Sequence, residues 1–287
     1  MFKKFLFTLK MYFIRGKDSQ TFLDARWIKS LLKNTPKRYK KTVVLNIMAL
    51  SPHYFFRTPE MKNRKYFLTS EYKRNLRSRQ MLFKHLISKH ISEQSVVMDY
   101  GCGPGFLART VAEKAKKVYA IDISDGVLLC ADTINHRDNI NYLNVFKNQT
   151  DAIADNSVDL IYSFAVLQHV SANLVDDIFS LFYKKLKENG KLLLHVQLQT
   201  QGWKTEKEWK DDNSVRGKLK YEYGLHCFSN TTSFYEEKME KNGLTFQSLI
   251  ELSNVLPDPN DHIYHQQLIT GKKESFVPTT NPQTILA

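Results

Sequence analysis

Short apolar segments alternate with amphipathic segments along the chain from about residue 95 onward. Five apolar runs have the length of buried strands: 96–100, 117–123, 140–146, 157–163 and 191–197. Between these runs, apolar residues recur at helical spacing over 106–115, 125–135 and 174–187. Strands that alternate with helices predict a mainly parallel sheet with right-handed crossovers. We therefore expect an α/β fold.

The C-terminal part departs from this alternation. A helix is predicted over 229–242, and Gly243 is placed to end it, as Gly190 is placed to end the helix before the fifth strand. Two further strands, 244–252 and 262–270, are separated by a proline-containing loop without a helix. Because adjacent strands without a crossover helix pair antiparallel, we expect the sheet to end in an antiparallel strand.

The first strand runs directly into a glycine-rich turn, Asp99-Tyr100-Gly101-Cys102-Gly103-Pro104-Gly105, and then into a helix. Glycines let a ligand approach the backbone closely, and the helix N-terminus behind them presents unpaired N–H groups. This order predicts a nucleotide-like cofactor at the turn. Asp99 would repel a pyrophosphate and attract an ammonium group. The turn therefore favours a cofactor with a positive group and no phosphate there.

Four segments together resemble the class I S-adenosylmethionine-dependent methyltransferases, of the small-molecule type. The glycine-rich turn resembles the first motif of that family, and Asp122 at the end of the second strand is similar to its ribose-binding acid. Residues 154–170 look like its fourth strand and the following turn, and residues 185–194 resemble its passage from helix through glycine to fifth strand. The resemblance covers about residues 92–271 and rests on the order and spacing of all four segments.

The resemblance implies a Rossmann-like, doubly wound sheet of seven strands in the order 3-2-1-4-5-7-6, with the last strand antiparallel. It also implies S-adenosyl-L-methionine as cofactor, lying across the carboxyl ends of the first two strands. Asp122 would accept the ribose hydroxyls, and Ile123 would pack on the adenine. The residues carried over as cofactor-binding in this region are Asp99, Gly101, Cys102, Gly103, Gly105, Asp122 and Ile123.

Three more positions complete the expected site. The family often has an acid near the adenine amine after the third strand, whereas this chain has Phe146-Lys147-Asn148-Gln149, and Asn148 is the expected substitute. The backbone at Phe164 should contact the methionine amino group. His169, six residues past the fourth strand, is the candidate general base; a structural histidine bonded to a backbone group is the alternative. No metal site is expected.

The turn after the fourth strand bears on the acceptor. Amino-directed nucleic-acid methyltransferases commonly have a Pro-Pro-aromatic stretch there. This chain has Ser163-Phe164-Ala165-Val166, which resembles the small-molecule, sugar and lipid-type enzymes, so we expect a small-molecule or glycan-like acceptor methylated on oxygen. A long segment after the fifth strand would either cover the acceptor or form an ordinary surface loop. Its candidate residues are Trp203, Trp209, Tyr221, Tyr223 and His226.

Charge divides the chain unevenly. Residues 1–95 hold 22 Lys and Arg against 5 Asp and Glu, a net charge of +17, whereas residues 96–287 carry −4. A basic segment attracts anionic partners, and a solvated helical face is the alternative. Two rival functions follow: an RNA methyltransferase with a basic N-terminal arm, or an enzyme acting on a membrane-held quinone or lipid-linked acceptor. A cofactor-binding partner protein without catalysis is a third.

We expect three regions: a basic, mostly helical N-terminal extension (1–62), a methyltransferase domain (63–274) opened by a helical lead-in (63–92), and a loose tail (275–287). No apolar run reaches the roughly 18 residues of a membrane-spanning helix, and Lys10 interrupts the candidate signal-peptide core. Three scattered cysteines give no disulfide framework. We therefore expect a cytoplasmic protein, with peripheral membrane contact as an alternative. The sequence leaves the oligomeric state open.

Overall fold

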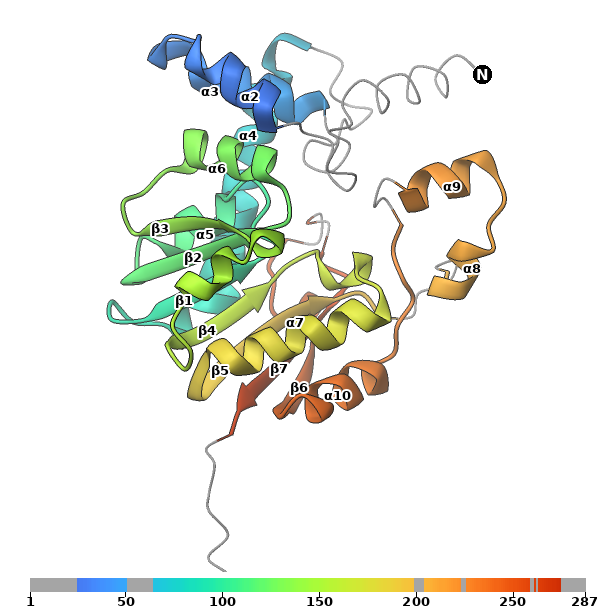
Figure 1. The fold of residues 1–287 in the computed structure, drawn as a ribbon. Helices are drawn as coiled ribbons and strands as arrows, with labels where there is room; N and C mark the ends of the chain where they lie inside the picture. Colours follow the sequence, from blue (N-terminus) through green and yellow to red (C-terminus); the bar gives the residue numbers. More distant parts are fainter. Residues whose placement is uncertain are drawn as a thin grey trace, which may run out of the picture.

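The computed structural model describes residues 25–50, 64–198, 204–222, 226–258, 261 and 263–274. At its centre lies a seven-stranded sheet in the order β3-β2-β1-β4-β5-β7-β6 (Figure 1). Strands β1 to β5 pair in parallel, and β7 is antiparallel to both β5 and β6. The predicted fold class and strand order are therefore confirmed. The strands are β1 (Val96–Tyr100), β2 (Lys117–Asp122), β3 (Ile140–Asn144), β4 (Val158–Ser163), β5 (Leu186–Val196), β6 (Leu244–Glu251) and β7 (Gln267–Lys273).

Helices cover both faces of the sheet, with α7 and α10 on one face and α5 and the end of α4 on the other (Figure 1). Helices α8 and α9 stand away from the sheet, at the edge of the molecule. The helices are α2 (Ala25–Lys33), α3 (Lys37–Leu50), α4 (Arg64–Leu82), α5 (Phe106–Val111), α6 (Asp125–Asn135), α7 (Ala172–Lys185), α8 (Glu206–Lys210), α9 (Val215–Glu222) and α10 (Thr232–Lys241).

The central strands are unbroken apolar runs in the sequence because both faces of the sheet are covered by helices. Successive side chains of a strand point to opposite faces. Val97 therefore enters the core beneath α4 and α5, whereas its neighbour Met98 enters the core beneath α7. Leu160 and Ile161 in β4 divide in the same way. Because both faces are buried, both sets of positions must be apolar.

A third core joins the N-terminal helices to the sheet domain. Ile28 of α2 and Val44 of α3 have no exposed surface, and they pack with Phe106 of α5 and with Val127 and Cys130 of α6. The described part of the segment 1–62 is helical and shares a core with the residues that follow the glycine-rich turn. The boundary at residue 62 stays a prediction.

The end of α7 corrects one expectation. The left-handed residue there is Asn189, with φ of 61°, and Gly190 does not take a positive φ. Gly190 lies inside β5, which begins at Leu186, four residues before the glycine. A Cβ on Gly190 would stand 2.8 Å from the carbonyl oxygen of Lys187 and 3.1 Å from that of Val158. The glycine is therefore required by close backbone packing, not by a helix cap.

Several expectations fall on residues outside the described part of the chain. They are the candidate signal-peptide core that contains Lys10, the tail after residue 274, Trp203 and Tyr223. Within the residues that are described, no helix is both long enough and apolar enough to cross a membrane.

Candidate cofactor and acceptor site

The glycine-rich turn is held against the end of β2. The N–H groups of Gly101 and Cys102 both donate to the carbonyl of Ile121, at 2.8 and 2.9 Å. A Cβ on Gly101 would stand 2.2 Å from Cγ2 of Val166, so this position has no room for a side chain. The turn also needs positive φ at Gly101 (78°), Gly103 (51°) and Gly105 (74°).

Asp122 joins this turn to the start of α6. Its Oδ2 accepts the N–H of Gly103 at 3.0 Å, and its Oδ1 accepts the N–H of Ser124 at 3.0 Å. Burial raises the pKa of Asp122, and these two amides oppose the rise. A carboxylate oxygen can accept more than one hydrogen bond. Asp122 is thus fixed in orientation, and its oxygens can still accept hydrogen bonds from the two hydroxyls of a vicinal diol.

Asp99 lies at the end of β1 and is only 3% exposed. Among the described residues, its Oδ2 is buried without a hydrogen-bond partner. Burial raises the pKa of Asp99 to about 7, and the nearby buried Tyr162 hydroxyl and the Arg79 guanidinium oppose this rise. The site therefore contains a buried acceptor that suits an N–H-bearing or cationic group. Cys102 beside it keeps its proton, because burial raises the pKa of the thiol well above its usual range.

Arg79 is a site residue that the sequence reasoning missed. It lies on the helical lead-in and is half-buried, and its guanidinium interacts electrostatically with Asp261 and Asp99. Burial lowers its pKa, and both carboxylates oppose that change. Its spacing from Tyr72 and Leu76, seven and three residues, places it on the apolar stripe of the helix. That spacing was the available signal.

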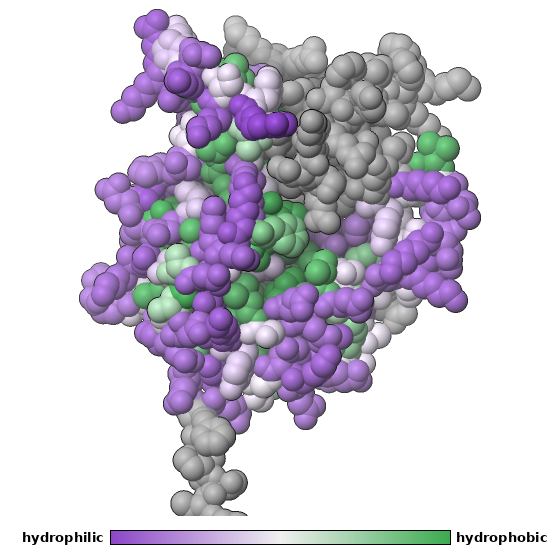
Figure 2. All heavy atoms as spheres, in the orientation of Figure 1, coloured by the Kyte–Doolittle hydropathy of each residue, from purple (hydrophilic) through white to green (hydrophobic). Residues whose placement is uncertain are grey.

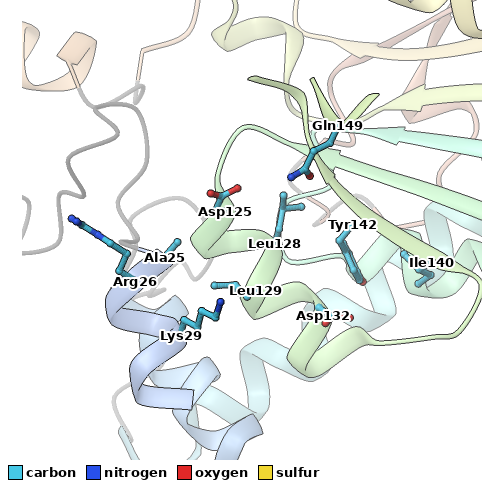
Figure 3. A pocket seen from close by; sticks show the side chains of 10 residues that line it. All are labelled: Ala25, Arg26, Lys29, Asp125, Leu128, Leu129, Asp132, Ile140, Tyr142 and Gln149. Atoms are coloured by element: carbon cyan, nitrogen blue, oxygen red, sulfur yellow. The ribbon is translucent and has the colours of Figure 1, made fainter. Parts of the chain in front are cut away.

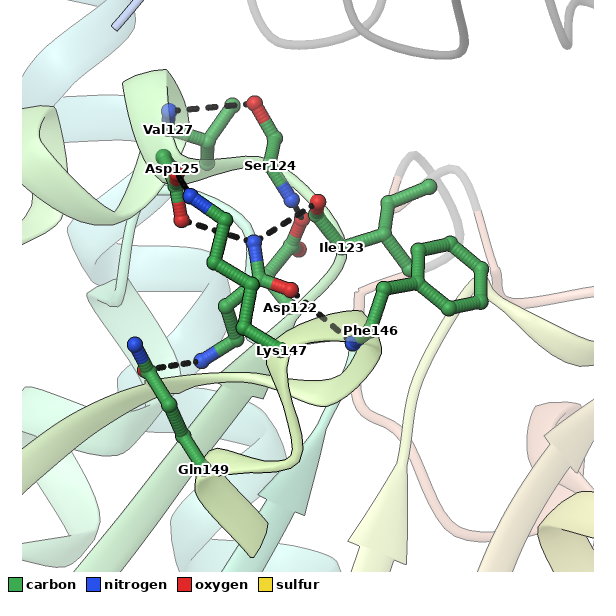
Figure 4. A network of polar contacts seen from close by, with 9 residues as sticks. Asp122, Ile123, Ser124, Asp125, Val127, Phe146, Lys147 and Gln149 are labelled. Carbon is green, nitrogen blue, oxygen red and sulfur yellow. Dashed lines mark hydrogen bonds and ion pairs between the residues drawn. The ribbon is translucent and has the colours of Figure 1, made fainter. Parts of the chain in front are cut away.

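The loops that follow β2 and β3 meet at the buried side chain of Asn144. Its Nδ2 donates to the Ile123 carbonyl at 3.0 Å and to Asp125 Oδ1 at 2.7 Å, and its Oδ1 accepts the N–H of Phe146 at 2.9 Å. These bonds hold two loops in one arrangement. The side chains of Ile123 and Phe146, 39% and 61% exposed, point away from these polar contacts (Figure 4). Phe146 was not among the predicted site residues.

The stretch after β3 supplies a cation where the family often has an acid. Lys147 forms an ion pair with Asp125, so its charge is directed toward the start of α6. Asn148, the expected substitute, is exposed and has a left-handed backbone with φ of 54°. Its amide remains a predicted contact.

The turn after β4 packs directly on the glycine-rich turn. Ser163 Oγ donates to the Tyr100 carbonyl at 2.9 Å, and Val166 lies against Gly101. Phe164 is partly buried, and its ring stacks on His195 with 5.9 Å between centroids. The structure thus brings Phe164 to the carboxyl edge of the sheet, beside the cofactor turn.

His169 follows this turn, and a backbone carbonyl fixes its ring. Its Nδ1 lies 2.5 Å from the carbonyl oxygen of His226. A carbonyl can only accept, so Nδ1 carries the proton, and Nε2 is left with the lone pair. Burial lowers the pKa of His169, which favours the neutral ring. The backbone bond that a structural histidine would make is therefore present, and it leaves Nε2 without a proton in the neutral ring.

The segment after β5 packs against the His169 turn through aromatic residues. The N–H of Phe228 donates to the Gln168 carbonyl at 2.7 Å, and Trp209 Nε1 donates to the Cys227 carbonyl at 2.8 Å. The rings of Trp209, Tyr221 and Phe228 lie within 6.1 Å of the His226 ring. Apolar side chains also gather over the strand ends in the middle of the face shown in Figure 2.

A separate pocket of about 440 Å³ opens between α2, α6 and β3 (Figure 3). Both acidic and basic side chains line it, among them Arg26, Lys29, Asp125 and Asp132. The pocket borders the Asn144 contacts through Asp125 and does not include the glycine-rich turn or Asp122. It is therefore a neighbour of the candidate cofactor site. Among the described residues, no group of three metal-binding side chains occurs.

Residues 98–194 match the methyltransferase domain family. This range contains the glycine-rich turn, Asp122, the turn after β4 and His169, in a sheet with the strand order that the family resemblance implies. The chain carries a class I S-adenosylmethionine-dependent methyltransferase domain. The cofactor of this family is S-adenosyl-L-methionine. A glycine-rich turn without room for side chains, a carboxylate held by two backbone N–H groups and a buried acceptor at Asp99 fit that cofactor.

Relatives of the methyltransferase domain act on different atoms. The N-demethylindolmycin N-methyltransferase of Streptomyces griseus is 36% identical over 76 residues, which are 26% of this chain and 32% of that protein. The geranyl diphosphate C-methyltransferase of Streptomyces coelicolor A3(2), crystallised with S-adenosyl-L-homocysteine, has 15% identity and a TM-score of 0.53, covering 84% of this chain and 98% of that one. This chain matches about a third of the length of the N-demethylindolmycin N-methyltransferase, so the likeness concerns the methyltransferase domain.

A second similar structure comes from a complex of the Haloferax volcanii Trm112 methyltransferase activator with its partner chain. It has 15% identity and a TM-score of 0.53, and the alignment covers 74% of this chain and 97% of that chain. At this identity the likeness concerns the fold.

Proposed function

We propose that this chain binds S-adenosyl-L-methionine across the ends of β1 and β2 and methylates an oxygen of a small-molecule or glycan-like acceptor. The observation that carries the proposal is the joint placement of the glycine-rich turn, Asp122 and His169 at one edge of the sheet. When bound, the cofactor supplies an activated methyl group. The protein then mainly has to orient two reactants, which is worth roughly 7–11 kcal/mol.

Complementary charges would hold the methionine part of the cofactor. Asp99 offers a carboxylate to the ammonium group, and the half-buried Arg79, which interacts electrostatically with Asp99, offers a cation to the carboxylate. Asp122 would accept the ribose hydroxyls, and Ile123 and Phe146 would pack on the adenine. Asn148 would bond the adenine edge.

His169 would serve an oxygen acceptor as the base. Its neutral ring and oriented Nε2 suit removal of a hydroxyl proton, an effect worth about 10²–10⁴-fold in rate. The aromatic residues Trp209, Tyr221 and Phe228, on the segment that packs against this histidine, would cover the acceptor. Sugars and small ring compounds pack well on such aromatic faces.

The acceptor is identified by incubating the full chain with methyl-labelled cofactor and a fractionated cell extract. The fractions are lipid, RNA, polysaccharide and small molecules. Label in the polysaccharide or small-molecule fraction, lost in His169→Gln, is the expected result. Failure of the chain to bind the cofactor in calorimetry would overturn the proposal. Binding without transfer to any fraction would favour a non-catalytic partner protein.

A basic surface favours a second candidate, in which the acceptor is part of a polyanion or lies on an anionic membrane. Residues 25–48 hold seven Lys and Arg and no Asp or Glu. Lys37, Arg38 and Lys41 are exposed, as are the rings of Trp27 and Tyr39. This surface, on α2 and α3, suits RNA phosphates or anionic lipid headgroups. Label in the RNA or lipid fraction would identify that case.

We also propose a cytoplasmic location, supported by three free thiols.

A further inference from the structure

The turn after β4 contains a strained residue. Ala165 has φ of 60°, a conformation that side chains other than Asn, Asp and glycine rarely adopt. Of the four non-glycine residues with positive φ in the described chain, the other three are asparagines. Asparagine can stabilise this conformation with its own side chain, whereas alanine cannot. Something outside Ala165 must therefore hold it there.

The structure shows one group placed to do this. The N–H of Ala165 donates to Nδ1 of His195 at 3.0 Å. His195 lies in β5, one residue after Leu194, which pairs with Ser163 at the end of β4. The histidine is therefore level with the turn. It has no exposed surface, and its ring stacks on Phe164 at an interplanar angle of 16°.

The chemistry of this contact fixes the state of the ring. Because the backbone N–H can only donate, Nδ1 of His195 must hold a lone pair, and the ring proton must lie on Nε2. A doubly protonated ring would present N–H to N–H and lose the bond. One neutral tautomer of His195 is thus matched to the strained form of the turn.

The position of Ala165 matters because its neighbours shape the cofactor site. The next residue, Val166, fills the space beside Gly101, and the preceding Phe164 lies at the carboxyl edge of the sheet. If Ala165 relaxed to a negative φ, both neighbours would be redirected. The glycine-rich turn would then no longer be packed against Val166 on its outer side.

We propose that His195 is a positioning residue that holds the turn after β4 in the form required for cofactor binding. It does so through the Ala165 amide and the stacked Phe164 ring, without touching the cofactor itself. The inference rests on the proposed function, since S-adenosyl-L-methionine is the ligand assigned to the turn.

Two isosteric variants of the full chain test the proposal. His195→Asn keeps an acceptor oxygen near the place of Nδ1, whereas His195→Leu keeps the volume and removes the acceptor. We expect His195→Leu to weaken S-adenosylhomocysteine binding about tenfold in titration calorimetry, and His195→Asn to restore most of that loss. Adding Ala165→Gly to His195→Leu should also restore binding, because glycine adopts the positive φ without help.

The outcomes separate the inference from the proposed function. If the wild-type chain does not bind S-adenosylhomocysteine, the proposed function fails. If the wild type binds and folded His195→Leu binds equally well, or if Ala165→Gly rescues nothing, the inference fails. Should His195→Leu not fold, nitrogen NMR of the wild-type imidazole decides. A proton on Nε2, with a coupling from Nδ1 to the Ala165 amide, supports the inference, and a proton on Nδ1 overturns it.

Discussion

Two carboxylates at neighbouring strand ends, the buried Asp99 and the half-buried Asp122, have different surroundings, which suit them to different tasks. Asp122 accepts two backbone N–H groups, so its orientation is fixed by the turns it joins. Asp99 has a buried oxygen without a partner among the described residues, and burial raises its pKa to about 7. The first is preorganised to bind a diol, and the second is poised to receive a charged group.

Replacing Asp122 with Asn should weaken cofactor binding by at least tenfold. The amide keeps one acceptor oxygen, but its NH₂ group faces a backbone donor, either Gly103 or Ser124. Calorimetry with S-adenosylhomocysteine measures the loss. The control is Asp132→Asn on the exposed side of α6, which removes the same charge and should bind like the wild type. Equal binding by both variants would contradict the role of Asp122.

The pKa of Asp99 predicts a pH dependence of stability in the protein without cofactor. The folded state raises this pKa from 3.8 to about 7, so between these values the folded protein holds a proton that the unfolded chain has released. The free energy of unfolding should therefore fall as pH rises from about 4 to 7, by an amount on the order of a few kcal/mol. Denaturant unfolding at several pH values measures this slope.

Asp99→Asn serves as the comparison, because it is neutral at every pH. Its free energy of unfolding should show a flatter dependence between pH 4 and 7 than the wild type. A slope unchanged by this substitution would assign the pH dependence to other groups.

At the scale of elements, the site consists of two turns that fit into each other. The glycine-rich turn leaves no room at Gly101 because Val166 of the other turn occupies it. Ser163 Oγ ties the same two segments through the Tyr100 carbonyl. The turns therefore form one packed unit, and a change in either should be felt in both.

Gly101→Ala should destabilise the protein by about 2–5 kcal/mol and abolish cofactor binding. Alanine at φ of 78° is strained, and its Cβ would stand 2.2 Å from Val166 Cγ2. Thermal and denaturant unfolding measure the loss. Adding Val166→Ala should recover the steric part, about 1–3 kcal/mol, and leave the backbone strain. If the double variant is no more stable than Gly101→Ala, contact with Val166 is not the cause of the destabilisation.

Local patterns in the sequence were sufficient to predict the alternating strands and helices and the antiparallel end of the sheet, whereas the strand order came from the family resemblance. Apolar runs gave the strands, and glycine spacing with Asp122 gave the turn. The sequence could not place Arg79, Phe146 or His195, since their roles arise from contacts between distant elements. It also assigned the left-handed conformation after α7 to Gly190, although Asn189 adopts it. Close packing of Gly190 on β4 there overrides the usual preference for glycine in the left-handed conformation after a helix.

For the whole molecule, charge and core divide the N-terminal helices into two sides. Apolar residues of α2 and α3 pack on α6, and the cations of these helices are largely exposed. Since the apolar residues are already buried, the surface left for a partner is mainly electrostatic. Its binding should therefore respond strongly to salt.

Charge reversal on α3 should reduce the affinity of the full chain for a polyanion, if the basic surface binds one. The variant combines Lys37→Glu, Arg38→Glu and Lys41→Glu. Its affinity for single-stranded RNA should fall, and the slope of log K against log salt should weaken by about 0.7 for each phosphate that the variant no longer neutralises. Fluorescence anisotropy with labelled RNA measures both. Sedimentation with anionic vesicles tests the membrane alternative in the same way.

A control for this experiment makes the same change in net charge outside α2, α3 and the segment after β5. It combines three exposed lysines, Lys116→Glu, Lys184→Glu and Lys191→Glu. Equal loss of affinity in the control would mean that net charge, and not the α2–α3 surface, governs the binding.

The core shared by α2, α3 and α6 has a consequence for how this protein can be shortened or borrowed. A fragment that starts at the helical lead-in would leave Val127, Cys130 and Ile134 of α6 without their cover, next to the loop that carries Asp122. Such a fragment would expose apolar surface that favours aggregation, close to the candidate cofactor site. Helices α2 and α3 therefore belong to the same packed unit as α6. Exchanging them between homologues would require exchanging the residues of α6 that they cover as well.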